Sequence, residues 1–138
     1  KEAVEVDLSD ITRNKKGFSI IIRNTVFKLL RMLAQEKFGP LCDSLEPSTS
    51  KTWREPDISA AIKPYYEQHQ YISTDKDSRA PRYHTLTKTD DNFWRVEQIL
   101  TDADEHNDWM MVLQIDLNKS RESQDCVISL ESIEEIGN

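Results

Sequence analysis

Glycine is scarce in this sequence, with only three among 138 residues, and its scarcity excludes the common nucleotide-binding loops. Loops of the GxxxxGK[ST] and GxGxxG types need several glycines close together because their backbone must approach the phosphates. Neither motif is present, nor is a GxSxG or an HExxH motif. The sequence therefore predicts no catalytic residues of a familiar type and no cofactor site in this domain.

Cysteine and long apolar runs are also few. Cys42 and Cys126 are the two cysteines, and their separation fits neither a zinc motif nor a disulfide framework. Two lone thiols without a secretion signal are typical of a reducing cytosol, so we expect a cytoplasmic location. No apolar run approaches the roughly 18 residues of a membrane span, which predicts no membrane association.

The net charge of −7 disfavours a general nucleic-acid-binding protein, but the charges are unevenly distributed. Residues 13–37 carry seven basic side chains and a single acidic one, Glu36. Three of these bases, Arg23, Lys28 and Arg31, are candidates for contacts with nucleic-acid phosphates. The alternative is that they form the solvated face of an amphipathic helix.

The chain is long enough for one hydrophobic core and not for two. Residues 1–16 are polar and lack a sustained period, which predicts a linker or N-terminal extension, with a single domain over residues 17–138. The first residue is Lys1 and not Met, and we therefore expect the chain to be part of a longer protein.

Two helices are predicted from apolar residues at helical spacing. The first begins near Phe18, and Gly39 followed by Pro40 is expected to end it, with a short helical turn over residues 41–45. The second begins near Asp57, an expected N-cap, and Pro64 within it predicts either a kink or two short helices.

After Pro81 the hydrophobic period changes to two, which predicts an antiparallel sheet. Residues 83–88 and 93–101 flank a turn over residues 89–92, a third strand alternates over residues 109–117, and a polar connection over 118–125 leads to a fourth strand. Helices followed by a meander of strands indicate an α+β fold, in which the N-terminal helices pack on a curved antiparallel sheet.

The segment DADEHND, residues 102–108, holds the densest chemistry in the chain. A calcium loop would need glycine and glutamate where Asn107 and Leu113 stand. Zinc requires more nitrogen or sulfur ligands than the single nearby His106 offers. A catalytic carboxylate–histidine pair would lack a nucleophile. We therefore predict a turn in which the acidic residues bond their own backbone, and no metal site.

Several polar or amphipathic side chains are expected to face one another between the helices and the sheet, where a ligand pocket would form. In this pocket Arg79, paired with Asp116 or Gln98, would bind an anion. The alternative is that the aromatic side chains fill the core and that Arg79 caps a loop. The candidate ligand-binding residues are Tyr65, Tyr66, His69, Arg79, Trp94, Gln98 and Asp116.

Four stretches of the chain carry a family resemblance that spans about residues 17–133. The stretch FWRVEQILTDADEHNDWMMVLQIDLNKS, residues 93–120, matches a pattern of W-x-V-x-Q-x-L, an acidic turn ending in Asp-Trp, and a strand end of the V-D-L-x-x-S type. The other three are IIRNTVFKLL, WREPDISAAIKPYYEQH and DSRAPR. The chain thereby resembles a C-terminal domain of unknown function appended to a group of bacterial superfamily II, DEAD/DEAH-box-type RNA helicases. It departs from the family pattern at Ser78, Ala80 and Ala103.

The resemblance implies that the parent protein is an ATP-dependent RNA helicase, an ATP hydrolase whose core would hold ATP and magnesium. This domain would then be a non-catalytic accessory domain whose partners are the helicase core of the same chain and an RNA or a protein. A homodimer through the sheet is a further expectation. The order of elements is also similar to the cone-shaped NTF2/SnoaL-like fold, which leaves open a small-molecule-binding or enzymatic pocket.

Overall fold

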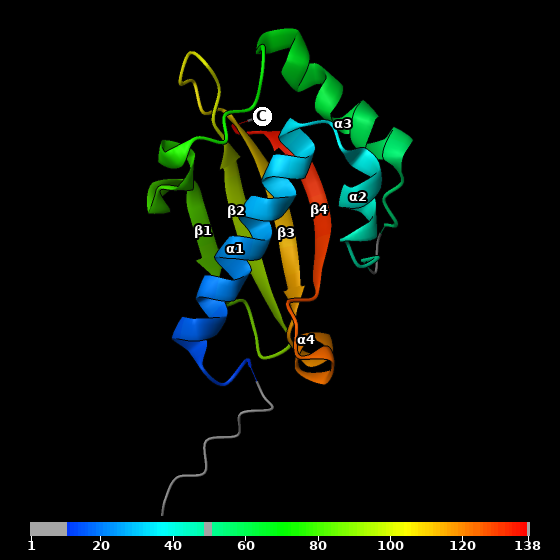
Figure 1. The fold of residues 1–138 in the computed structure, drawn as a ribbon, viewed down its shortest axis with the longest axis vertical. Coiled ribbons are helices and arrows are strands. Elements are labelled where there is room, and N and C mark those ends of the chain that lie inside the picture. The colour runs from blue at the N-terminus through cyan, green and yellow to red at the C-terminus, as the bar shows by residue number, and fades with distance from the viewer. Residues whose placement is uncertain (1–10, 49–50, 138) are drawn as a thin grey trace, which may run out of the picture.

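The computed structural model describes residues 11–48 and 51–137, in which helices pack on a four-stranded antiparallel sheet. Helix α1 (Lys15–Ala34) lies across one face of the sheet, and the shorter helices α2 (Phe38–Asp43) and α3 (Glu55–Gln68) lie beside it (Figure 1). The predicted α+β class is confirmed. The part of the predicted linker at residues 1–10 lies outside the described residues.

Helix α1 buries the predicted apolar stripe, including Phe18, Ile22 and Leu33. It begins earlier than predicted because the Asn14 side chain accepts a hydrogen bond from the Gly17 N–H and caps the first turn. It also ends earlier, at Ala34.

The predicted stop at Gly39-Pro40 is wrong, because a Schellman motif ends α1 before them. The Glu36 N–H donates to Leu33 and the Lys37 N–H to Met32, and Glu36 adopts a left-handed conformation with φ 57°. A residue other than the expected glycine therefore occupies the left-handed position. Gly39 and Pro40 instead lie within α2.

Helix α3 begins at Glu55, and Asp57 is not its N-cap. The Asp57 carboxylate accepts a hydrogen bond from the N–H of Arg54, the residue that precedes the helix. Of the two alternatives at Pro64, the division into two short helices does not occur, since α3 continues through Pro64 as one helix; the kink stays a prediction. The carbonyl of Ala60, which the absent Pro64 N–H would have bonded, belongs to an exposed residue.

The sheet is a meander in which β1 (His84–Thr87), β2 (Phe93–Leu100), β3 (Trp109–Asp116) and β4 (Ile128–Glu135) pair in sequence order. Before β1, the chain forms two short 3₁₀ turns, η1 (Lys76–Arg79) and η2 (Pro81–Tyr83). The core face of the sheet meets α1 where Phe18 packs on Trp94, with ring centroids 5.7 Å apart.

The connection between β3 and β4 differs from the prediction. Residues predicted as a polar loop form helix α4 (Leu117–Ser123), whose first turn is capped by the Asp116 carboxylate through the Lys119 N–H. The pairing of β3 with β4 contains a register shift: Val112 pairs with Ser132, but Leu113 pairs with Leu130, so β4 has one extra residue there. Leu130 and Ile133 are therefore both buried although their positions differ by an odd number of residues.

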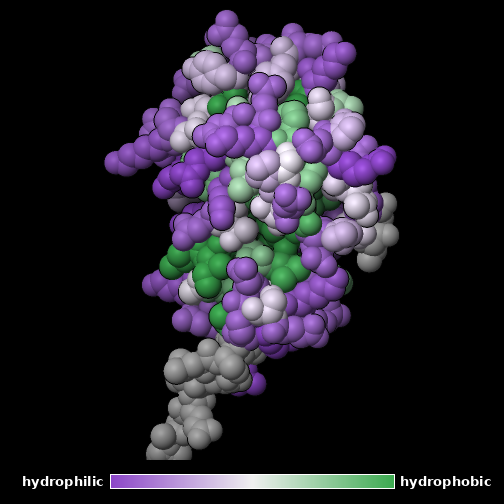
Figure 2. Space-filling view, turned by 45° about the vertical axis from the view of Figure 1, so that its right-hand side comes forward, coloured by the Kyte–Doolittle hydropathy of each residue, from purple (hydrophilic) through white to green (hydrophobic). Residues whose placement is uncertain are grey.

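The opposite face of the sheet is more polar, with Arg95 and Glu97 forming an ion pair on β2. The surface in Figure 2 is largely hydrophilic, and its apolar atoms gather at the height where α1 begins. Ile20 and Ile21, in the second turn of α1, are exposed. None of the described helices is long and apolar enough to span a membrane.

Candidate functional site

The side chains predicted to share one pocket occupy separate places. Arg79 and Gln98 line one pocket between α1 and the start of the sheet. Tyr66 and His69 line a second hollow, near the loop between β2 and β3. Asp116 is the last residue of β3, where its carboxylate caps α4 and lines a different hollow. The predicted pairing of Arg79 with Asp116 is therefore not formed, whereas Arg79 and Gln98 do lie together.

The first pocket, which we call the arginine pocket, has a volume of about 190 Å³. Three arginines line it, two from α1, about two helical turns apart, and one from η1. Its lining residues are Arg23, Asn24, Phe27, Arg31, Arg79, His84 and Gln98. Two of the three predicted nucleic-acid-binding residues, Arg23 and Arg31, are thus in the pocket, and Lys28 is exposed outside it.

Phe27 forms the apolar base of the arginine pocket. The Arg79 guanidinium carbon lies 4.2 Å from the centroid of the Phe27 ring, and that of Arg31 lies 5.5 Å from it. Stacking on an aromatic ring orients a guanidinium and leaves its N–H donors free at the edges. Within the described residues, no carboxylate lies within 4.0 Å of Arg23, Arg31 or Arg79. Among the described residues, the three guanidiniums of the pocket therefore form no ion pair with a carboxylate.

His84 and Gln98 form the sheet side of the pocket. They are cross-strand partners, and the His84 Nδ1 atom lies 3.1 Å from the Gln98 Oε1 atom. Burial lowers the pKa of His84, the hydrogen bond to Gln98 raises it, and the nearby Arg23 charge lowers it, with a net decrease from the ordinary value. The imidazole is therefore mostly neutral at pH 7. Its single N–H, on Nδ1, is donated to the Gln98 Oε1 atom, so the positive charge of the pocket comes from the arginines and not from His84.

The DADEHND segment forms a loop that is organised around one buried carboxylate, as the predicted turn requires. Asp102, which is 4% exposed, accepts hydrogen bonds from the N–H groups of Asp104, His106 and Asn107 at 3.1, 3.1 and 2.7 Å. Burial raises the pKa of Asp102, but these bonds and the neighbouring His69 outweigh it, so the net pKa is lower than usual. The carboxylate therefore stays ionised.

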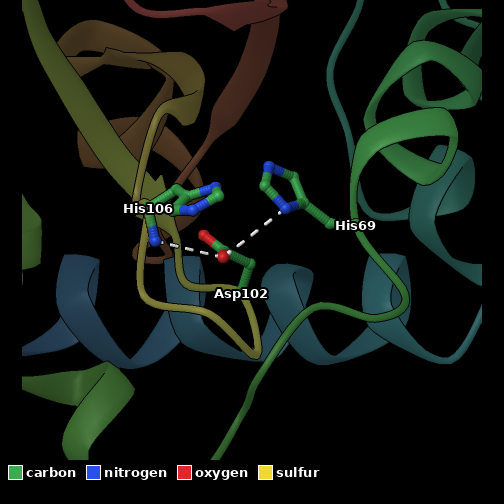
Figure 3. Close-up of side chains that lie close together, drawn as sticks. All are labelled: His69, Asp102 and His106. Carbon is green, nitrogen blue, oxygen red and sulfur yellow. Dashed lines mark hydrogen bonds and ion pairs between the residues drawn. The ribbon is translucent and has the colours of Figure 1, made fainter.

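His69 lies against this loop from the end of α3, which the sequence did not indicate. Its Nε2 atom lies 3.0 Å from the Asp108 Oδ1 atom, and its Nδ1 atom lies 3.5 Å from the Asp102 Oδ2 atom (Figure 3). In Figure 3 the Asp102 carboxylate lies between His69 and His106, and the ring centroids of the two histidines are 5.5 Å apart. The His106 of the loop thus has a second histidine beside it, whereas the prediction of no metal site counted only one.

A family model described as a domain of unknown function (DUF3516) matches residues 1–133. The chain belongs to the DUF3516 family. No curated protein and no solved structure matches the chain. The predicted NTF2/SnoaL-like cone, beyond the α+β class, therefore stays a prediction.

The remaining predicted residues of the DUF3516 domain serve its core. Tyr65 is fully buried and donates its hydroxyl to the Tyr71 carbonyl at 2.7 Å, and burial together with the Asp102 charge raises the pKa of this phenol. Trp94 is buried against Phe18. Tyr66 packs edge-on against Tyr65, with ring centroids 5.3 Å apart. These contacts agree with the alternative in which the aromatic side chains fill the core.

Three residues of the arginine pocket were not predicted as ligand-binding or nucleic-acid-binding: Asn24, Phe27 and His84. Phe27 follows Arg23 by four residues, so a helical projection could have placed it beside Arg23; Asn24, the next residue after Arg23, projects about 100° away. No comparable signal exists for His84, because its position depends on how the first strand pairs with the second.

Proposed function

We propose that this DUF3516 domain is a non-catalytic accessory domain of a bacterial, cytoplasmic ATP-dependent RNA helicase, and that it binds the RNA backbone through the arginine pocket. The observation that carries the proposal is the convergence of Arg23, Arg31 and Arg79 on one pocket, without carboxylate partners among the described residues. The role in a helicase comes from the sequence resemblance described above.

The charge of the pocket supports a phosphate ligand. The domain as a whole is acidic, with a net charge of −7, so a cluster of three arginines runs against its average composition. Guanidinium groups bind phosphate oxygens with two parallel hydrogen bonds, which an ammonium group does not do as well. The Phe27 ring holds two of these guanidiniums in position, so less side-chain conformational entropy is lost when a ligand binds.

The shape of the pocket also favours a phosphate over a larger molecule. Its volume of about 190 Å³ is smaller than the roughly 300–1,000 Å³ of sites that enclose a drug-sized ligand. A phosphate of a nucleic-acid strand fits such a site while the rest of the strand remains outside. In the small-molecule alternative, the same pocket would bind a small free anion. Binding of such an anion without RNA would favour this alternative.

The test is binding of a fluorescent single-stranded RNA, followed by anisotropy at several salt concentrations. Arg23→Gln combined with Arg31→Gln is expected to weaken binding at least tenfold. Each phosphate contact to a single strand contributes about −0.7 to the slope of log K against log salt, so the double variant should reduce the slope by about 1.4.

Arg95→Gln combined with Lys63→Gln is the matched control, because both side chains lie outside the pocket and the net charge changes equally. This control should lose less than threefold in affinity. Equal losses in the two double variants, or no RNA binding at 50 mM salt, would contradict the proposal. Saturable binding of inorganic phosphate or a nucleotide without RNA binding would instead favour the small-molecule alternative.

A further inference from the structure

We propose that His69, Asp102 and His106 form a site for a divalent transition metal ion, for which Zn²⁺ is the best match. The three residues each offer one ligand atom, and these atoms lie within 4.8 Å of one another. The site lies where the end of α3 meets the loop between β2 and β3 (Figure 3), and it shares no residue with the arginine pocket.

The protonation of His69 leaves a lone pair directed at the site. Its Nε2 atom lies 3.0 Å from Asp108, and an ionised carboxylate can only accept, so Nε2 carries the proton. In the neutral ring Nδ1 is then an acceptor. This Nδ1 atom is buried and has no hydrogen-bond partner among the described residues. His69 itself is 7% exposed, so water does not readily satisfy the nitrogen.

The atom that faces this lone pair is also a Lewis base. The Asp102 Oδ2 atom is 3.5 Å from Nδ1, which is longer than the 2.7–3.2 Å typical of an N–H···O hydrogen bond. Two ligand atoms that each lie about 2.0–2.1 Å from a tetrahedral Zn²⁺ are roughly 3.3 Å apart. The observed separation is therefore close to the one that a bound cation would require.

The surroundings of the two buried ligands resemble those of metal sites. A ligating histidine commonly donates its other N–H to a carboxylate, which orients the ring and increases its basicity, and Asp108 occupies that place. The Asp102 carboxylate is already held by three backbone N–H groups. Both groups are therefore held in position before an ion binds, and an ion on the Oδ2 atom would share this oxygen with the N–H groups of Asp104 and His106.

His106 completes the set from the solvent side. It is exposed, so its ring can rotate toward the ion without disturbing the core. Two imidazoles and one carboxylate are ligands typical of Zn²⁺, and three protein ligands leave a fourth position for water. A hollow lined by His69, Gln70 and Asp104 lies next to the site and would admit this water.

The first experiment is titration of Zn²⁺ into the metal-stripped, untagged chain, followed by calorimetry. We expect one ion per chain. His106→Ala should weaken binding at least tenfold without unfolding, since the side chain is exposed. Asp108→Asn leaves all three ligands in place and should weaken binding by about tenfold or more, through loss of the oriented His69 ring. The matched control is His84→Gln, which removes the remaining histidine of the chain outside the site and should change affinity less than twofold.

A second measurement separates a bound ion from a protonated His69 that bridges Asp102 and Asp108. Nitrogen-15 NMR of the imidazoles should show Nε2 protonated and Nδ1 free of a proton, with the Nδ1 resonance shifting on addition of Zn²⁺. The proposal is overturned if His69 remains doubly protonated in excess Zn²⁺. It is also overturned if no saturable binding occurs, or if His84→Gln weakens binding as much as His106→Ala.

Discussion

Replacing Asp102 by alanine should destabilise the domain far more than any other change in the acidic loop. The Asp102 carboxylate accepts three backbone N–H bonds and is almost fully buried. A hydrogen bond to a charged group contributes about 1.5–3 kcal/mol, but the released N–H groups of a surface loop regain part of this from water. We therefore expect a loss of about 2–4 kcal/mol in the free energy of unfolding.

Urea denaturation at pH 7 in the presence of a chelator measures this loss without a contribution from metal. Asp104→Ala is the control, because Asp104 is an exposed acid two residues away and should cost no more than about 0.5 kcal/mol. If the two variants have the same midpoint and slope, the loop is not organised by Asp102, and the physical account of DADEHND given above fails.

The pH dependence gives the same prediction a second test. The pKa of Asp102 is below its model-peptide value of 3.8 in the folded protein, so the unfolded chain binds its proton more readily. The stabilisation is therefore fully present above about pH 5 and is lost as the pH falls through the lowered, folded-state pKa. The difference in stability between the wild-type protein and Asp102→Ala should become smaller over that acidic range.

Three further predictions concern the rest of the fold. Glu36→Gly should raise the free energy of unfolding by about 0.5–1 kcal/mol in urea titrations, because glycine adopts the left-handed conformation without a steric penalty; an unchanged or lower midpoint would contradict this. Trp53→Phe should lower it by about 1–3 kcal/mol, because the buried Leu130 carbonyl loses the indole N–H that lies 2.7 Å away; a change below about 0.5 kcal/mol would show that this bond contributes little. Burial raises the pKa of the Cys126 thiol to about 12, so iodoacetamide at pH 8 should label it much more slowly than a free thiol, and equally rapid labelling in the native protein would refute the assignment.

The sequence alone determined the elements whose signal is local. The apolar stripe that includes Phe18 and Ile22 specified α1, and the alternation from Trp109 to Ile115 specified β3, because helical and extended backbones repeat their side-chain directions with fixed periods. The turn between Lys88 and Phe93 likewise follows from side chains that bond their own backbone, as the Asp90 carboxylate does with the Phe93 N–H.

Helix ends and the single helix α3 were harder to predict because local signals competed there. Glu36 in a left-handed conformation ended α1 before Gly39, although Gly39 was the stronger helix-end signal in the sequence. Asp116 capped a helix in a segment whose polarity suggested a loop. In both cases hydrogen bonds formed by neighbouring backbone groups outweighed the average preference of the residue types.

Only the tertiary structure decided which reactive side chains meet. His69 and Asp102 are 33 residues apart, and Arg23 and Arg79 are 56 apart; neither pair shares a helix turn or a strand pairing that a sequence period could reveal. Their positions depend on how α3 packs against the end of the sheet and on how η1 folds back toward α1, which is governed by burial of the common core. That packing is why a loop that looked like a solvated turn contains a buried carboxylate and lies against a histidine from the end of α3.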